Sequence, residues 1–405
     1  MTTIAKAGNS GPRVRSDCFV QVELSENGGI LFELKSRVAS LYKKSITYLL
    51  HEVLNYFDIE HAKIEMVDRG ALPWVISARL EAAIKQLKNS TKEYLPEFNK
   101  KNEYDSEKEH NRFTRLYLPG NTPSLFINAG LHKPDAIILD LEDSVAPEKK
   151  DEARILVRNA LRACDFYGAE RMVRINQGKR GIEDLKYVIP HNAHLILIPK
   201  TERISMVQKV ESEIINLCRS NRIFKTTFLM PIIESALGVE NAFEIAKASQ
   251  DIVALAIGLE DYTADIGARR TNEGSESFYA RSRIVNAAHA VGVQPIDSVF
   301  SDIDNMDALL SNAKQSKGLG FMGMGCIHPR QIAVIKEGFA PLINDIEKAK
   351  QIVFAAKKAK KLGLGVVAFG SKMIDAPVVK RHMKEIDLAI NMGLLKPDWE
   401  GGMVE

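Results

Sequence analysis

Short apolar segments recur between residues 114 and 326, and sequence with helical periodicity follows each of them. This alternation limits the chain to the α/β class, because it predicts parallel strands joined by helices. A (β/α)8 barrel accommodates eight such segments better than an open sheet does. The predicted strands are 116–118, 136–139, 172–175, 195–198, 228–233, 253–257, 293–296 and 320–324.

The 405 residues are too many for the barrel alone, so we expect additional domains. Residues 1–90 predict a small α+β domain, and 91–113, dense in charge and poor in aliphatic residues, predict a linker outside the core. The barrel is expected over 114–342, followed over 343–405 by a C-terminal helical segment with a lid. The elements predicted in the first domain are strands at 18–24, 30–32 and 62–67 and helices at 36–57 and 78–87.

The composition, 45% hydrophobic and 26% charged, is that of a soluble globular protein. A net charge of +3 does not favour a nucleic-acid partner. No uncharged apolar run approaches the roughly 18 residues that span a bilayer, and the first residues lack the apolar core of a signal peptide. The four scattered cysteines predict neither disulfides nor a zinc site. We therefore expect a cytoplasmic protein without membrane contact.

Acidic side chains recur where the predicted strands end. In a parallel barrel these ends converge on one mouth, where the acids repel one another unless a cation neutralises them. Carboxylate oxygens without clustered His or Cys favour Mg²⁺, with Mn²⁺ as the alternative. One acidic cluster alone is more often a solvated loop or a helix cap, but recurrence at consecutive strand ends favours a site. The polar strand-end residues are 140–143, Arg174, Lys200, Glu234, 260–261, Asp297 and His328.

Residues 318–323 fit the pattern GxGxxG. A dinucleotide site needs this pattern after a strand and at the start of a helix, whereas here it precedes or overlaps a predicted strand. The sequence contains no GxxxxGK[ST], HExxH or GxSxG motif. Nicotinamide and flavin chemistry is therefore not favoured.

A series of motifs in order along the barrel resembles the citrate lyase β-subunit family of the HpcH/HpaI aldolase superfamily, and the later motifs are similar to malyl-CoA and citramalyl-CoA lyases. The resemblance implies a (β/α)8 fold and a magnesium-dependent carbon–carbon lyase. The motifs are 116–121 (LYLPGN), 138–147 (ILDLEDSVAP), 173–176 (VRIN), 198–202 (IPKTE), 231–235 (PIIES), 258–261 (GLED), 279–283 (YARSR), 327–329 (IHP) and 373–377 (MIDAP).

The resemblance also implies roles for individual residues. Glu234 and Asp261 match the metal ligands, and Arg174 matches a catalytic residue that contacts the substrate oxygen at the bond being broken. Asp375 resembles a catalytic aspartate that relatives deliver into a neighbouring subunit, which implies a homo-oligomer, a trimer or a hexamer, with shared sites. The residues that resemble thioester contacts are Tyr117, Ile327 and His328, and those expected to orient water on the metal are Glu142 and Asp297.

Residues 5–87 resemble the acyl-carrier subunit of citrate lyase. The matching segments are Ala7–Gly8, Ser16–Asp17, 67–72 (VDRGAL) and 78–82 (ARLEA). In that family a serine just before the aspartate carries a phosphopantetheine-type arm derived from coenzyme A. Here Arg15 occupies that position, so Ser16 is the neighbouring candidate for attachment and loss of the arm is favoured.

The reaction implied is retro-Claisen cleavage of a 3-hydroxyacyl-CoA thioester into acetyl-CoA and a small oxoacid. One alternative is a citryl-carrier lyase whose substrate is tethered to its own N-terminal domain. An inactive scaffold homologue is another, against which the retained Arg174, Glu234, Asp261 and Asp375 argue. An aldolase for unesterified oxoacids is a third, and the thioester contacts argue against it.

Overall fold

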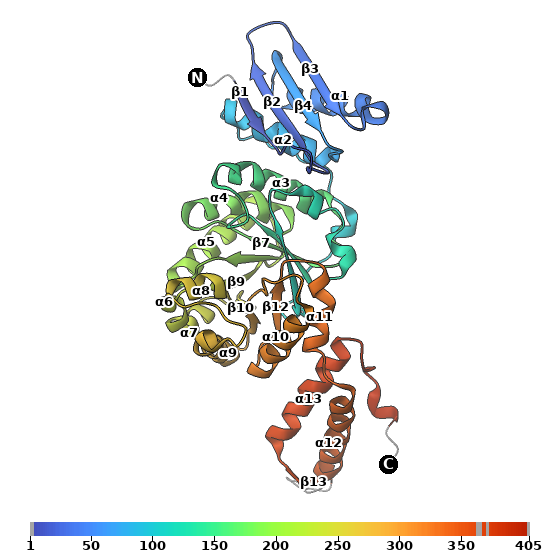
Figure 1. Ribbon diagram of the computed structural model, residues 1–405, viewed down its shortest axis with the longest axis vertical. Helices are drawn as coiled ribbons and strands as arrows, with labels where there is room; N and C mark the ends of the chain where they lie inside the picture. Colours follow the sequence, from blue (N-terminus) through green and yellow to red (C-terminus); the bar gives the residue numbers. More distant parts are fainter. Residues whose placement is uncertain (1–3, 362–366, 370–371, 403–405) are drawn as a thin grey trace. The chain divides into compact units, whose positions relative to one another are not determined.

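The computed structural model describes residues 4–361, 367–369 and 372–402. The chain divides into two compact units, Met1–Ile335 and Lys336–Glu405. The first unit contains a small α+β domain and a closed barrel (Figure 1). Among the described helices, none has the length and apolar character needed to cross a membrane.

The N-terminal domain is a four-stranded sheet, in the order β1-β2-β4-β3, with two helices. Buried side chains alternate along β2 and β4, as expected for a sheet with one face on a core. Every element predicted here is confirmed, but the sequence analysis missed β1. The elements are β1 (Ile4–Ala7), β2 (Cys18–Leu24), β3 (Ile30–Ser36), α1 (Ala39–Tyr56), β4 (Ala62–Asp68) and α2 (Pro73–Leu87).

All eight predicted barrel strands are present, and they form a closed parallel barrel from β5 to β12. Pairing of β12 with β5 closes the ring. The strands are β5 (Thr114–Pro119), β6 (Ala136–Asp140), β7 (Glu170–Arg174), β8 (Leu195–Ile198), β9 (Phe228–Ile233), β10 (Ala254–Ile257), β11 (Gln294–Asp297) and β12 (Gly323–Cys326). The helices are α3 (Lys150–Ala163), α4 (Gly178–Val188), α5 (Ile204–Asn221), α6 (Ala236–Glu240), α7 (Ala242–Ala246), α8 (Leu259–Asp265), α9 (Phe278–Val291), α10 (Met306–Leu319) and α11 (Arg330–Phe339).

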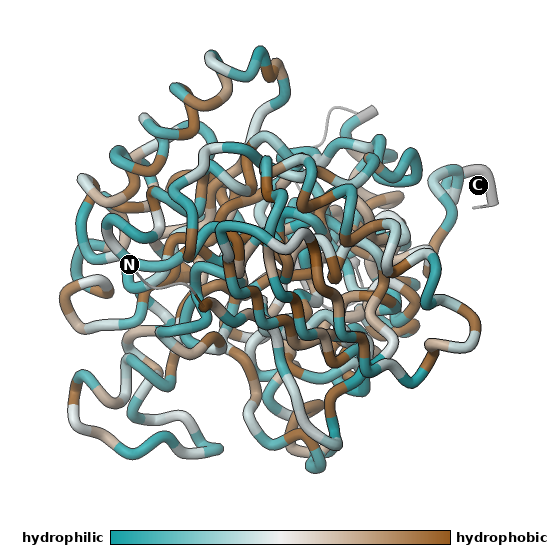
Figure 2. The backbone as a smooth tube through the Cα atoms, turned by 90° about the horizontal axis from the view of Figure 1, so that it is seen from above, coloured by the Kyte–Doolittle hydropathy of each residue, from teal (hydrophilic) through white to brown (hydrophobic). Residues whose placement is uncertain are grey.

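Apolar side chains at alternate strand positions fill the barrel interior. Ile138, Leu197 and Met230 belong to this buried cluster, and the ring of Tyr117 packs against it. Figure 2 shows hydrophobic stretches concentrated toward the middle of the view and hydrophilic stretches in the outer loops. A barrel of this kind has a packed core and not a pore, so polar groups at its mouth rest on an apolar floor.

The charged segment before the barrel is more buried than a linker. Its regular structure includes the short 3-10 helix η1 (Lys100–Asn102). Asn102 and Arg112 are fully buried, and Arg112 pairs with Glu170 of β7 at 2.7 Å. The expectation that this segment stays outside the core is wrong at these positions, because Glu170 pairs with Arg112 and backbone carbonyls accept from the side-chain amide nitrogen of Asn102.

A buried ion-pair network joins the N-terminal domain to the barrel. Arg79 of α2 contacts Asp17 at 2.9 Å and Glu152 of α3 at 3.2 Å. Arg158 of α3 contacts Glu81 of α2 at 2.7 Å. Since these guanidinium groups have no exposed side-chain surface, losing either partner would leave a buried charge uncompensated.

The second unit begins within α11 and continues through α12 (Ile343–Lys361), β13 (Val367–Phe369), β14 (Lys372–Ile374) and α13 (Ala376–Asn391). Ala349 and Val353 of α12 pack against Ile386 of α13. The predicted C-terminal helical segment is therefore present. Part of the predicted lid, residues 362–366 and 370–371, lies outside the described residues.

Candidate active site

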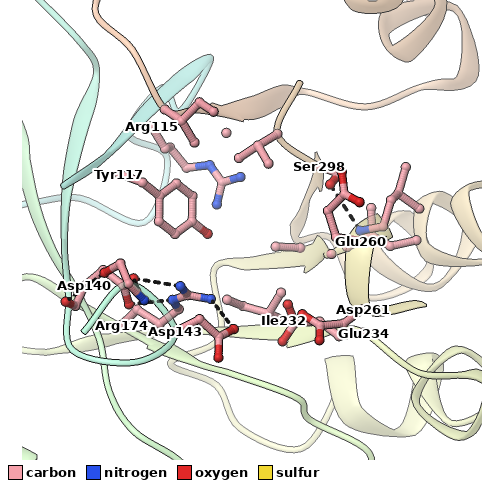
Figure 3. A pocket seen from close by; sticks show the side chains of 18 of the residues that line it. Arg115, Tyr117, Asp140, Asp143, Arg174, Ile232, Glu234, Glu260, Asp261 and Ser298 are labelled. Atoms are coloured by element: carbon pink, nitrogen blue, oxygen red, sulfur yellow. Dashed lines mark hydrogen bonds and ion pairs between the residues drawn. The ribbon is translucent and has the colours of Figure 1, made fainter. Parts of the chain in front are cut away.

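A pocket of about 340 Å³ lies at the carboxyl ends of the barrel strands (Figure 3). Its walls come from β5, β6, β7, β9, β10, β11 and β12 and the loops that follow them. This is the end of a parallel barrel where catalytic groups gather. The predicted residues that line it are Tyr117, Arg174, Glu234, Asp261, Asp297 and Ile327.

Arg174, the last residue of β7, is held by carboxylates from the end of β6. Its Nε and Nη2 donate to the two oxygens of Asp140 at 2.6 and 2.7 Å, and Nη1 lies 3.0 Å from Glu142. Burial opposes the charge, but hydrogen bonding and attraction from Asp140 outweigh it and raise the pKa of Arg174. The guanidinium therefore stays cationic and is fixed in orientation.

Glu234 follows β9, and its side chain is almost fully buried in the pocket wall, 7% of the residue being exposed. Its Oε2 accepts the backbone N–H of Lys200 at 2.8 Å. Burial raises the pKa of Glu234 to about 7, and the carboxylate of Asp261 acts in the same direction. The ionised carboxylate is thus under-compensated by its protein neighbours.

Asp261, in α8, lies beside Glu234 at the same wall (Figure 3). Lys200 Nζ contacts its carboxylate at 3.2 Å. A Cβ at Gly258, the residue before α8, would collide with the carboxylate of Glu234, so a side chain there would displace the acid. The sequence predicted Glu234 and Asp261 as one pair, and the structure brings them together.

No three acidic, His or Cys side chains converge as a ready metal site within the described ranges. Mg²⁺, however, commonly binds one or two protein carboxylates and completes its octahedron with water and substrate oxygens. Glu234 and Asp261 supply hard oxygen donors of this kind, and the raised pKa of Glu234 marks negative charge that a cation would neutralise. The donor set therefore fits Mg²⁺.

The three residues predicted to contact the thioester have different surroundings. Tyr117 lies against Arg174, whose guanidinium carbon is 5.4 Å from the centre of its ring. Ile327 lines the pocket, whereas Nδ1 of His328 accepts the backbone N–H of Arg330. The sequence analysis missed Gln331, whose buried amide oxygen accepts the N–H groups of Ile327 and His328 at 2.9 and 3.2 Å.

Glu142 and Asp297 are already engaged by protein groups. Glu142 contacts Arg174 and accepts from Gln177 at 2.8 Å. The carboxylate of Asp297 accepts from Arg281, Ser316 and the backbone of Ser298. Their expected contact with water on a metal stays a prediction.

Two further predicted residues belong to the second unit and to the N-terminal domain. Asp375 caps α13 in the second unit, where its carboxylate accepts the N–H of Val378 at 3.1 Å. Ser16 is half-buried with a positive φ of 53°, and its N–H donates to the carbonyl of Arg69. Both proposed roles stay predictions.

The sequence analysis gave no role to three polar residues of this region. Asp140 and Lys200 stood among its strand-end residues, and their contacts with Arg174 and Asp261 depend on the closed barrel. Arg115 gave no signal, because it lies inside an apolar strand and not at its end.

Two family models match the chain. The model described as HpcH/HpaI aldolase/citrate lyase matches residues 114–329, and the one described as malonate decarboxylase delta subunit (MdcD) matches residues 5–87. Citrate lyase subunit beta of Leuconostoc mesenteroides subsp. cremoris is 36% identical over 301 residues, which are 73% of this chain and 98% of that protein.

Two further similarities extend this result. The mitochondrial citramalyl-CoA lyase of Homo sapiens is 30% identical over 326 residues, covering 77% of this chain and 95% of that protein. The crystal structure of protein CitE from Mycobacterium tuberculosis in complex with magnesium, acetoacetate and coenzyme A is 27% identical. It covers 70% of this chain and 99% of that one, with a TM-score of 0.59.

Proposed function

The chain belongs to the HpcH/HpaI aldolase/citrate lyase family and is a carbon–carbon lyase, and from this premise we propose that it cleaves a 3-hydroxyacyl-coenzyme A of the malyl or citramalyl type. The proposed products are acetyl-CoA and a 2-oxoacid. One observation carries the proposal: Glu234 and Asp261 share a pocket with the fixed guanidinium of Arg174. The relative from M. tuberculosis, crystallised with magnesium, acetoacetate and coenzyme A, supports the choice of metal and thioester.

Glu234 and Asp261 are the proposed ligands of Mg²⁺, with Mn²⁺ as the alternative. When bound, the ion supplies Lewis-acid polarisation of the hydroxyl and carboxylate oxygens of the substrate. Lys200, 3.2 Å from Asp261, neutralises part of the acidic wall in the free protein.

Arg174 is the proposed group that stabilises negative charge on the reacting oxygen. A guanidinium has five N–H donors, and the bonds to Asp140 and Glu142 engage three of them. Nη1 also lies 3.6 Å from Asp143, so the second N–H of Nη2 is the donor proposed for an oxygen in the pocket. Because carboxylates fix the guanidinium, little reorganisation is needed as charge develops, and such preorganised donors typically contribute several kcal/mol.

The bond changes balance without a redox partner. The substrate hydroxyl loses its proton and becomes the carbonyl of the oxoacid, and the electrons of the adjacent C–C bond move to the carbon next to the thioester. Protonation of the resulting enolate gives acetyl-CoA. Asp375 of a neighbouring subunit is the proposed proton donor, so the proposal includes a homo-oligomer, a trimer or a hexamer.

A tethered citryl substrate is the second candidate, and one observation favours it. In the loop before β2, the Gly8 N–H donates to Glu152 of the barrel, and Asn9 donates to the carbonyl of Asn121. Asn121 belongs to the turn that follows β5, the strand that carries Tyr117. The loop that bears Ser16 is therefore tied to the same end of the barrel as the pocket.

A coupled assay for acetyl-CoA and oxoacid release from malyl-, citramalyl- and citryl-CoA, with and without Mg²⁺, tests the reaction. Arg174→Lys keeps the charge beside Asp140 but loses the bidentate fork, so turnover should fall by about 10²-fold or more. The exposed Arg203→Lys is the matched control. Near-normal turnover of Arg174→Lys would remove this residue from the mechanism, and failure to cleave all three thioesters would refute the reaction. A phosphopantetheine-type mass on the intact chain would favour the tethered substrate.

A further inference from the structure

Arg115 is a buried cation inside the barrel. It lies on β5 two residues before Tyr117, so both side chains point to the same side of the strand. Only 1% of Arg115 is exposed, and its Nη1 lies 3.0 Å from the sulfur of Met230 in the interior cluster. Figure 3 shows its guanidinium directed into the pocket beside the ring of Tyr117.

The guanidinium of Arg115 is poorly compensated. Within the part of the chain that the structure describes, it forms no ion pair with a carboxylate, and its Nε has no hydrogen-bond partner. The methionine sulfur is a weak acceptor. Burial accordingly lowers the pKa of Arg115. A buried charge in this condition is destabilising relative to one with full hydrogen-bond partners.

Among the residues that the structure describes, other fully buried arginines have more hydrogen-bond partners than Arg115, although Nη1 of Arg171 also lacks one. Arg79 and Arg158 pair with carboxylates. Arg171 lacks a carboxylate partner but donates to backbone carbonyls, including those of Asn192 and Asn102. Arg115 lines the pocket and has neither a carboxylate nor a backbone carbonyl of the described chain as a partner. A buried polar group that lacks a partner in the protein and faces a pocket is expected to bind a ligand.

A structural role accounts poorly for this arrangement. The surrounding interior is apolar, so an apolar side chain of similar volume would fill the space without the cost of desolvating a charge.

We propose that Arg115 forms an anion subsite of the pocket and binds a second carboxylate on the oxoacid half of the substrate. This proposal rests on the proposed cleavage reaction and, within it, favours the citryl type of substrate over the malyl and citramalyl types, which release the monocarboxylates glyoxylate and pyruvate. It selects 3-hydroxyacyl thioesters whose released 2-oxoacid is a dicarboxylate. Citryl- and citramalyl-CoA form a matched pair, because a carboxymethyl group of the first replaces a methyl group of the second, and their oxoacids are oxaloacetate and pyruvate.

The binding test uses the full-length protein with Mg²⁺ and titrates oxaloacetate and pyruvate by calorimetry. Wild type should bind oxaloacetate at least about tenfold more tightly, as expected for a charge-assisted hydrogen bond in a buried site. Arg115→Met should remove this preference and leave the Kd for pyruvate unchanged. Met230→Leu, which keeps the charge and removes its sulfur contact, is the matched control and should keep the preference.

Equal affinity of wild type for the two oxoacids would overturn the subsite. So would an Arg115→Met variant that keeps the preference, or one that melts at lower temperature and weakens both ligands equally, because that pattern belongs to a packing role.

The ratio of kcat/KM for citryl-CoA to that for citramalyl-CoA extends the test to catalysis, and it should fall at least about tenfold in Arg115→Met. A wild type that cleaves neither thioester but prefers oxaloacetate would refute the proposed reaction and support the subsite. An unchanged ratio would overturn the subsite in an active enzyme.

Discussion

Replacing Glu234 by glutamine should stabilise the metal-free protein at pH 8. The pKa of Glu234 is raised from its usual 4.5 to about 7 in the folded protein. The unfolded chain therefore loses this proton near pH 4.5, and the folded protein keeps it until about pH 7. Above pH 7 the ionised folded state carries a penalty of roughly 3 kcal/mol, at about 1.36 kcal/mol per pKa unit.

The sign of the effect follows from the protons bound. Between pH 4.5 and about 7 the folded state binds more protons at this site than the unfolded state, so stability falls as pH rises. Glutamine has nearly the same shape, can still accept the N–H of Lys200 and cannot ionise. The variant should thus gain most at pH 8, by up to about 3 kcal/mol, and little at pH 4.5.

Thermal unfolding between pH 5 and 8, with and without Mg²⁺, measures this difference. For a barrel of this size the gain corresponds to roughly 6–12 °C in Tm. Mg²⁺ should raise the Tm of wild type at pH 8 and leave Glu234→Gln nearly unchanged, since binding to the folded state alone stabilises it. Glu244→Gln, at an exposed site in α7, is the matched control. A lower Tm for Glu234→Gln than for wild type in metal-free buffer at pH 8 would refute the reasoning.

Three further predictions follow from the same geometry. The Kd for Mg²⁺ should rise up to about tenfold per pH unit below pH 7 and stay flat above it, with proton release detectable by calorimetry in two buffers; a pH-independent Kd would contradict this. Gly258→Ala should weaken Mg²⁺ binding at least about tenfold by displacing Glu234, whereas Gly318→Ala, where an added Cβ meets nothing within 4 Å, should leave it unchanged. Arg79→Met should cost about 3–5 kcal/mol in unfolding experiments by leaving buried Asp17 without an ion-pair partner and Glu152 with Lys149 as its ion-pair partner, and an unchanged Tm would count against the network.

The fold was predictable because it follows from local patterns. Short apolar strands and helical stripes are properties of neighbouring residues, and all eight predicted barrel strands were confirmed. The family matches confirmed the resemblance to the lyase family and the carrier-type N-terminal domain. β1 was missed because four residues, Ile4–Ala7, are too short for a periodic signal. The burial of Asn102 and Arg112 was missed because their partners lie far along the chain.

The sequence predicted those residues of the candidate site that lie at or just after the end of a strand. Glu234 and Asp261 follow consecutive strands, so the parallel topology alone brings them to one wall. The ion pair between Asp140 and Arg174 depends on the side-chain geometry of two neighbouring strands. The spacing of these residues in the sequence does not specify that geometry. The ion pair also changes how Arg174 must be tested. Removing the guanidinium entirely would leave a buried carboxylate unpaired, so Arg174→Ala would lower stability together with turnover.

Arg115 and Glu234 carry opposite charges that the protein itself compensates poorly. Glu234 bears negative charge that burial disfavours, and Arg115 bears positive charge without an ion-pair partner among the described residues. Figure 3 places them on different sides of the pocket, with Tyr117 beside Arg115. A divalent cation would compensate the first and a ligand carboxylate the second, so a metal and a dicarboxylate bound together would remove both deficits. The two uncompensated charges lower the stability of the free protein, and compensating them contributes to the affinity for these ligands. The two ligands together should therefore raise Tm by more than either one alone.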